Sequence, residues 1–133
     1  MIVVDTSAWI ELLNGTGSPV HVRLREALRG DEEVCVTEIV VAEVLAGARS
    51  VQHTEQLRSM LLGFTLLPLR GLDGFEQAAA LYRSCRWAGE AVRSIVDCLV
   101  AVPAIAAGAP VLHTGRDFGA LARHTPLEVV SVA

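Results

Sequence analysis

Short apolar stretches alternate with helical stretches along the whole chain, and this alternation most restricts its fold. Apolar runs that predict strands lie at residues 2–4, 34–36, 64–69, 111–113 and 129–132. Such alternation predicts an α/β fold with a largely parallel central sheet of about five short strands, flanked by helices on both faces. Parallel strands end at one edge, so residues that follow the strands are expected to meet there.

Helix signals fill the intervals between these strands. Apolar residues recur at helical spacing, Ser and Thr stand at helix starts, and glycines follow the helix ends. The predicted helices are residues 8–13, 19–29, 38–46, 51–62, 72–87, 94–107 and 117–123. The interval lengths leave no room for a second core, so we expect a single domain over residues 1–133.

The composition indicates a compact soluble protein, because 52% of the residues are apolar and 20% are charged. No apolar run approaches the ~20 residues that a membrane helix needs. No basic stretch precedes the apolar start, as it would in a secretory signal. We therefore expect a cytoplasmic protein that does not bind membranes. Cys35, Cys85 and Cys98 are widely spaced among apolar neighbours and are predicted to be reduced core thiols.

Two predicted helices each contain one acid among apolar neighbours. Glu43 is flanked by apolar residues on both sides, and Asp97 is the only charged residue between Ser94 and Ala106. A helix that is apolar all round is buried all round, so we expect both carboxylates to be buried. Burying an ionised carboxylate alone costs several kcal/mol. Each of these acids therefore needs a cation, a set of hydrogen-bond donors or a proton.

Two further acids follow predicted strands. Asp5 comes directly after the first strand, and Asp117 comes shortly after the strand that ends at His113. Thr6 and Ser7 offer caps for the helix behind Asp5. Taken alone, Asp5 is explained equally well as a helix cap and as a site residue. Asp117 alone is better explained as a helix-start acid beside Arg116, where the helix dipole favours it.

Taken together, Asp5, Glu43, Asp97 and Asp117 are expected to gather at the carboxyl edge of the parallel sheet. Four carboxylates in one place repel one another unless a cation lies between them. Ligands that are all oxygen atoms favour Mg²⁺, with Mn²⁺ as a possible substitute. Two such ions ~3.5–4 Å apart stabilise the attacking and leaving oxygens of a phosphoryl displacement. We therefore expect phosphodiester hydrolysis, with the four acids as metal ligands and catalytic residues.

Other residues near these acids are candidates for substrate contacts. Ser7 and Thr114 are placed to hold a metal-bound water or a carboxylate oxygen, or to cap helices. Arg93 and Arg116 are placed to contact phosphates, or to be ordinary surface arginines. The net charge of −4 argues against a broad basic face for nucleic acid, so such contacts would be local.

Four segments in this order, residues 3–8, 37–47, 97–101 and 113–118, resemble PIN-domain ribonucleases, and in particular the VapC toxins of VapBC toxin–antitoxin modules. The resemblance covers essentially the whole chain. It implies a PIN-like fold and a magnesium-dependent endoribonuclease with Asp5, Glu43, Asp97 and Asp117 around the metal. It also implies a homodimer, a structured RNA substrate such as transfer or ribosomal RNA, and inhibition by a cognate VapB-type antitoxin.

Two positions depart from the pattern of these relatives. Gly115 stands where many of them carry Asp or Asn, so the last motif supplies one acid, Asp117, and occupancy of a second metal position is left open. Pro103 interrupts the helix that carries Asp97, and an interior proline bends a helix. Because Pro103 follows Asp97 by six positions, a bend is expected beyond the site.

Two alternatives to a ribonuclease remain at this stage. The first is a DNA nuclease or a phosphatase that uses the same acids, although an aspartyl phosphatase needs a second Asp where this chain has Ser7. The second is a PIN-like module with weak or no catalysis that binds a partner and regulates it. The presence of all four acids favours catalysis over the second alternative.

Overall fold

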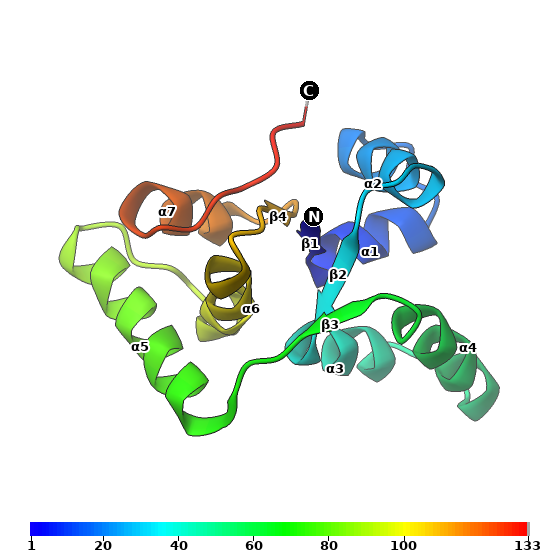
Figure 1. Ribbon diagram of the computed structural model, residues 1–133, viewed down its shortest axis with the longest axis horizontal. Helices are drawn as coiled ribbons and strands as arrows, with labels where there is room; N and C mark the ends of the chain where they lie inside the picture. Colours follow the sequence, from blue (N-terminus) through cyan, green and yellow to red (C-terminus); the bar gives the residue numbers. More distant parts are fainter. Residues whose placement is uncertain (133) are drawn as a thin grey trace.

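All strands in the part of the chain that the structure describes, residues 1–132, run parallel in one sheet. The computed structural model forms four strands and seven helices over these residues (Figure 1). The strand order is β3-β2-β1-β4. The strands are β1 (Ile2–Val4), β2 (Val34–Thr37), β3 (Thr65–Leu67) and β4 (Val111–Leu112).

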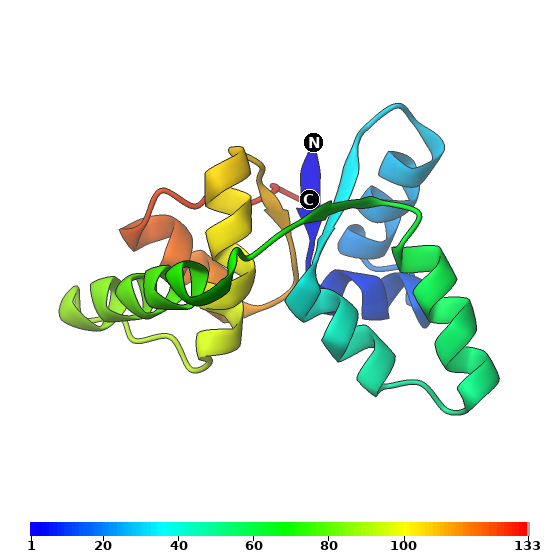
Figure 2. The same ribbon diagram turned by 60° about the horizontal axis from the view of Figure 1, so that its bottom comes forward.

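The helices follow the predicted intervals closely. They are α1 (Thr6–Leu13), α2 (Pro19–Arg29), α3 (Glu38–Ala46), α4 (Val51–Leu61), α5 (Gly71–Trp87), α6 (Ile95–Ala107) and α7 (Arg116–His124). Helices α1 to α4 lie on one side of the sheet and α5 to α7 on the other (Figure 2). The predicted layers, a parallel sheet with helices on both faces, are confirmed.

The prediction of about five strands is wrong, because the last apolar run does not form a strand. Val129 makes one isolated parallel bridge to Val111, and the Val130 N–H donates to the Val111 carbonyl at 2.9 Å. Strand β4 contains only Val111 and Leu112. Its outer edge is therefore too short to support a longer ladder, and the sheet has four strands over residues 1–132.

The core lies between the sheet and the two helix layers. The three residues of β1 are all buried, and Trp9 of α1 is fully buried against Phe64, with ring centroids 5.3 Å apart. The three cysteines are buried free thiols, as predicted. Helix α6 is the most buried helix and continues through Pro103, so the first turn that carries Asp97 is regular helix.

Over residues 1–132, no helix combines the length and the apolar composition that crossing a bilayer requires.

Candidate active site

Asp5 stands where β1 ends and α1 begins, and it caps that helix itself. Its Oδ2 accepts hydrogen bonds from the Ser7 backbone N–H at 3.1 Å and from Ser7 Oγ at 2.6 Å. The residue is only 6% exposed. The expectation that Thr6 and Ser7 would cap α1 is therefore wrong, because the extended backbone at Asp5 aims its carboxylate at the first turn. The second oxygen, Oδ1, is left for another partner.

Ser7 connects Asp5 to the loop that follows β4. Besides donating to Asp5, Ser7 Oγ accepts a hydrogen bond from the Thr114 backbone N–H at 3.1 Å. The Thr114 side chain is exposed, so Thr114 takes part through its backbone. Ser7 thus ties the start of α1 to the loop between β4 and α7.

Glu43 lies on an exposed face of α3, which corrects the expectation that it is buried. Helix α3 buries Val40 and Val44, whereas Ala42 and Ala46 are exposed beside Glu43. Because alanine counts as apolar, the sequence pattern predicted a helix that is buried all round, whereas one side of α3 faces solvent. Glu43 Oε1 accepts a hydrogen bond from Thr6 Oγ1 at 2.8 Å.

Asp97 lies in the first turn of α6, and the other three acids raise its pKa. It is partly buried, and its pKa is raised from 3.8 to about 7. Burial is the main cause, followed by the negative charges of Asp5, Asp117 and Glu43, while Arg93 opposes the shift. No hydrogen bond contributes to this shift. The four predicted acids therefore lie within electrostatic range of one another, around Asp97.

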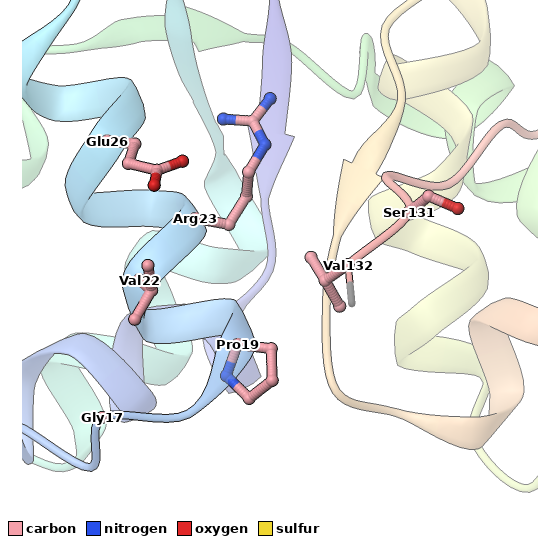
Figure 3. A pocket seen from close by; sticks show the side chains of 7 residues that line it. All are labelled: Gly17, Pro19, Val22, Arg23, Glu26, Ser131 and Val132. Carbon is pink, nitrogen blue, oxygen red and sulfur yellow. The ribbon is translucent and has the colours of Figure 1, made fainter.

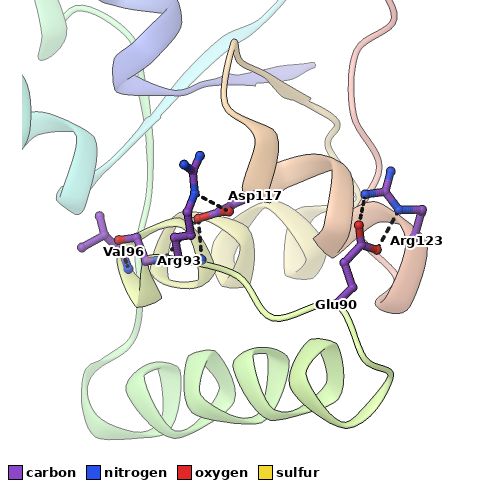
Figure 4. A network of polar contacts seen from close by, with 6 residues as sticks. Glu90, Arg93, Val96, Asp117 and Arg123 are labelled. Carbon is purple, nitrogen blue, oxygen red and sulfur yellow. Dashed lines mark hydrogen bonds and ion pairs between the residues drawn. The ribbon is translucent and has the colours of Figure 1, made fainter.

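Asp117 in the first turn of α7 is 8% exposed and is held by the α5–α6 loop (Figure 4). Its Oδ2 accepts hydrogen bonds from the backbone N–H groups of Arg93 at 2.9 Å and Ser94 at 3.1 Å. Arg93 Nε lies 3.7 Å from Asp117 Oδ1, and the Arg93 side chain is 71% exposed. Arg93 thus partly neutralises the acids from the solvent side. Arg116, which precedes Asp117 in the sequence, is exposed.

The chemistry of these donors fits a hard divalent cation, since all are carboxylate or hydroxyl oxygens. Within residues 1–132, no three His, Cys, Asp or Glu side chains converge at metal-ligand spacing. A cation would relieve the repulsion that raises the pKa of Asp97. The carboxylates available to such a cation are those of Asp5, Asp97, Glu43 and Asp117, of which Asp117 already accepts two backbone hydrogen bonds.

Comparison with known proteins identifies the family. The family model described as "PIN domain" matches residues 2–124. The chain belongs to the PIN-domain family. This PIN domain is 39% identical over 132 residues to Ribonuclease VapC11 from Mycobacterium tuberculosis, covering 98% of each chain.

Solved structures agree with this assignment. A structure of VapBC-5, a member of the VapBC family of toxin–antitoxin systems from M. tuberculosis, matches with a TM-score of 0.65 and 27% identity, covering 98% of each chain. VapBC2 from Rickettsia felis, bound to a DNA fragment from its promoter, matches with a TM-score of 0.70 and 16% identity, covering 98% of each chain. The second likeness is one of fold. The resemblance to VapC proteins that the four sequence segments indicated is thereby confirmed.

Two polar features of this PIN domain were missed at the sequence level. His113, at the end of β4, has a buried Nδ1 without a hydrogen-bond partner, and its ring packs on Phe118 at 4.9 Å; burial lowers its pKa. Glu90 in the α5–α6 loop binds Arg123 at the end of α7 (Figure 4) and also binds His124. No spacing rule links residues 33 or 34 positions apart, so only the fold reveals the Glu90 contacts.

Two hollows lie on the surface of this PIN domain. One is lined by α2 and by Ser131 and Val132, and it contains none of the four acids (Figure 3). The other includes Glu43 itself and runs between α1, α3 and α4. We call the second hollow the Glu43 groove; its lining residues include Ile10, Leu13, Val44, Arg49, His53 and Leu57.

Proposed function

We propose that this PIN domain is a metal-dependent endoribonuclease, the toxin of a toxin–antitoxin module. It hydrolyses phosphodiester bonds in structured RNA such as transfer or ribosomal RNA and requires Mg²⁺, which Mn²⁺ can replace. The observation that carries the proposal is the raised pKa of Asp97, caused in part by Asp5, Asp117 and Glu43. The name of the 39% identical relative, Ribonuclease VapC11, supports RNA as the substrate.

Each residue near the acids has a role in this proposal. Asp5 and Asp97 hold the ion, and Glu43 and Asp117 complete its surroundings. The bound ion would supply a nucleophilic water and stabilise charge on the phosphate. Ser7 keeps the Asp5 carboxylate oriented through its 2.6 Å hydrogen bond.

The arginine side chains beside the four acids are exposed, so they can contact the substrate. Because the Arg93 side chain is 71% exposed, its guanidinium is able to contact an RNA phosphate while its backbone holds Asp117. Arg116 and Thr114 are exposed on the neighbouring loop and are proposed as further substrate contacts.

We further propose that a VapB-type antitoxin binds the Glu43 groove. Ile10 is 48% exposed and Leu13 is 45% exposed there, so the groove offers apolar surface to a partner. An apolar helix or extended segment of the antitoxin would cover them, and its basic side chains would reach the acids. Structural neighbours solved as VapBC assemblies support such a partner.

A homodimer and a cytoplasmic location complete the proposal. Leu72 and Phe75 of α5 are 74% and 50% exposed, on the side of the fold away from the Glu43 groove, and they offer an apolar contact between two copies. Transfer and ribosomal RNA are cytoplasmic, which places the proposed reaction in that compartment.

The deciding experiment is an RNA cleavage assay with the purified protein on total transfer and ribosomal RNA. Cleavage is expected with Mg²⁺ or Mn²⁺ and is expected to stop with a chelator. Asp5→Asn and Asp97→Asn should each lower the rate by about 100-fold or more. Asp73→Asn, an exposed aspartate of α5, is the matched control and should cleave like wild type.

Three outcomes separate the alternatives. Cleavage that survives chelation would refute the metal mechanism. Cleavage of single- or double-stranded DNA in preference to RNA would favour the nuclease alternative. Tight antitoxin binding without any cleavage would favour the non-catalytic module, an alternative consistent with the lack of three converging metal ligands in residues 1–132.

A further inference from the structure

The α5–α6 loop contacts helix α7 at both ends of that helix (Figure 4). At the start of α7, the backbone N–H groups of Arg93 and Ser94 donate to Asp117. At the end of α7, the Glu90 carboxylate receives hydrogen bonds from Arg123 and His124. Between them, Val92 is 2% exposed and packs into the core. The loop is therefore attached to α7 at both ends of that helix and to the core through Val92.

The contact at Glu90 is an ion pair with two residues at the end of α7. Arg123 Nε donates to Glu90 Oε1 at 2.9 Å, and Arg123 Nη2 donates to Glu90 Oε2, so the pair is bidentate. His124 Nε2 lies 2.8 Å from Glu90 Oε1. Arg123 and then His124 lower the pKa of Glu90 to about 2. Glu90 is therefore ionised throughout the working pH range.

The backbone at Glu90 is also fixed. The Glu90 N–H donates to the Cys85 carbonyl and the Gly89 N–H donates to the Arg86 carbonyl, both at 3.0 Å. This is the Schellman motif that ends α5, and it requires the positive φ of 85° that Gly89 adopts. Glu90 is thus joined to α5 through its backbone and to α7 through its side chain.

We propose that Glu90 is a positioning residue for the acidic site. By holding the end of α7, it keeps the loop in the register at which Arg93 and Ser94 donate to Asp117. This inference rests on the proposed ribonuclease function for its effect on rate, but its effect on the loop is independent of that function.

The alternative is that the Glu90 pair contributes only to stability. The side chains of Glu90 and Arg123 are 41% and 57% exposed, and exposed ion pairs contribute little to the free energy of unfolding. The chain contains a second bidentate pair for comparison, with less exposed side chains, 28% and 29%. Arg23 and Glu32 also form a bidentate pair, at 2.7 and 2.9 Å, on the α2 side of the sheet and away from the four acids.

The experiment compares Glu90→Ala with Glu32→Ala in the full chain. Amide hydrogen exchange, measured by NMR without metal, reports on the two N–H groups that hold Asp117. In Glu90→Ala, we expect exchange at Arg93 and Ser94 to become about tenfold faster, with unchanged exchange at Val3 and Val4 of β1. In Glu32→Ala, all four amides should exchange as in wild type.

Kinetics provide the second measurement. Glu90→Ala should lower kcat for RNA cleavage by about tenfold, since Asp117 is displaced, and should also raise KM, since Arg93, the proposed phosphate contact, lies in the same loop. Glu32→Ala should change neither. The swapped pair Glu90→Arg with Arg123→Glu should recover part of both effects.

The outcomes are distinguishable. If wild type does not cleave RNA, the proposed function fails, and the exchange rates still decide the role of Glu90. If exchange at Arg93 and Ser94 is the same in Glu90→Ala as in Glu32→Ala, or if all amides accelerate together, the positioning role is refuted.

Discussion

Ser7 Oγ lies 2.6 Å from Asp5 Oδ2 and also accepts a hydrogen bond from the backbone N–H of Thr114. One hydroxyl group therefore joins Asp5 to the loop that precedes Asp117. Because the hydroxyl proton is committed to Asp5, the Asp5 carboxylate is held in a single orientation with Oδ1 left for a ligand. We therefore expect the proposed site to depend on this hydroxyl as well as on the four carboxylates.

Replacing Ser7 with Ala should lower the RNA cleavage rate by about 10- to 100-fold, the range typical for residues that orient metal ligands. Ser7→Thr keeps the hydroxyl and should retain most of the activity. The check is a comparison of kcat at saturating Mg²⁺ with the Mg²⁺ affinity measured by calorimetry. Equal activity of the Ala and Thr variants would show that the hydroxyl has no role.

Asp97 should make stability depend on pH when no divalent metal is present. Its folded-state pKa is raised from 3.8 to about 7, so the folded state binds the proton more tightly than the unfolded state. This contribution is complete below about pH 4 and is lost as the pH rises to about 7. We expect Tm to fall through this window. Mg²⁺ should raise Tm at pH 7 and above by binding the ionised form.

Asp97→Asn should flatten this pH dependence. Above pH 7 without metal, we expect the variant to exceed wild type by about 1–2 kcal/mol, after allowance for solvent screening of the partly exposed carboxylate. Thermal unfolding from pH 4 to 8, with and without Mg²⁺, measures both effects. A large loss of stability would instead mean that Asp97 is a structural hydrogen-bonding residue.

The Glu43 groove can be tested separately from catalysis. Leu13→Arg places a charge among apolar contacts and should weaken antitoxin binding by at least about tenfold. RNA cleavage without antitoxin should be unchanged, because Leu13 lies outside the four acids. Co-purification and calorimetry with the cognate antitoxin measure the first effect. Leu72→Arg on α5 is the control and should not affect antitoxin binding.

Gly74 should tolerate no side chain. A Cβ at this position would lie 1.9 Å from the Leu69 carbonyl oxygen and 2.8 Å from Leu69 Cγ. Gly74→Ala should therefore destabilise the fold by about 3 kcal/mol, as overpacking against backbone does. Gly115→Ala is the comparison, since its Cβ would meet only Phe118 Cδ2 at 3.7 Å. Urea unfolding of both variants gives the difference.

The sequence is sufficient to predict where each acid sits along the elements. The end of a β-branched run predicts the end of a strand, and the carboxyl ends of parallel strands lie at the same edge of the sheet. Asp5 and Asp117 therefore lie where the pattern places them, after β1 and β4, and both are buried. Asp97 fits because α6 buries most of its residues, which leaves a carboxylate in its first turn partly desolvated.

The exposure of Glu43 and the partners of each acid are not readable from the sequence. Ala42 and Ala46 count as apolar in a pattern but cost little when exposed, so α3 opens toward solvent on that side. Thr6 reaches Glu43 across 37 positions, and this contact depends on how α1 packs beside α3. Local patterns contain no information about such contacts. The absence of a fifth strand has a similar cause. The apolar run at residues 129–132 was visible in the sequence, but the shortness of β4, with which it would have to pair, was not.

The placement of β1 between β2 and β4 has a consequence for how the protein is made. Asp5 emerges first from the ribosome, but Val3 and Val4 pair with Val111 and Leu112, more than a hundred positions later. Asp117 follows that pairing, so it can join Asp5 only after residues 111–117 have been synthesised. Under the proposed function, a nascent chain that lacks β4 and Asp117 is therefore expected to be inactive.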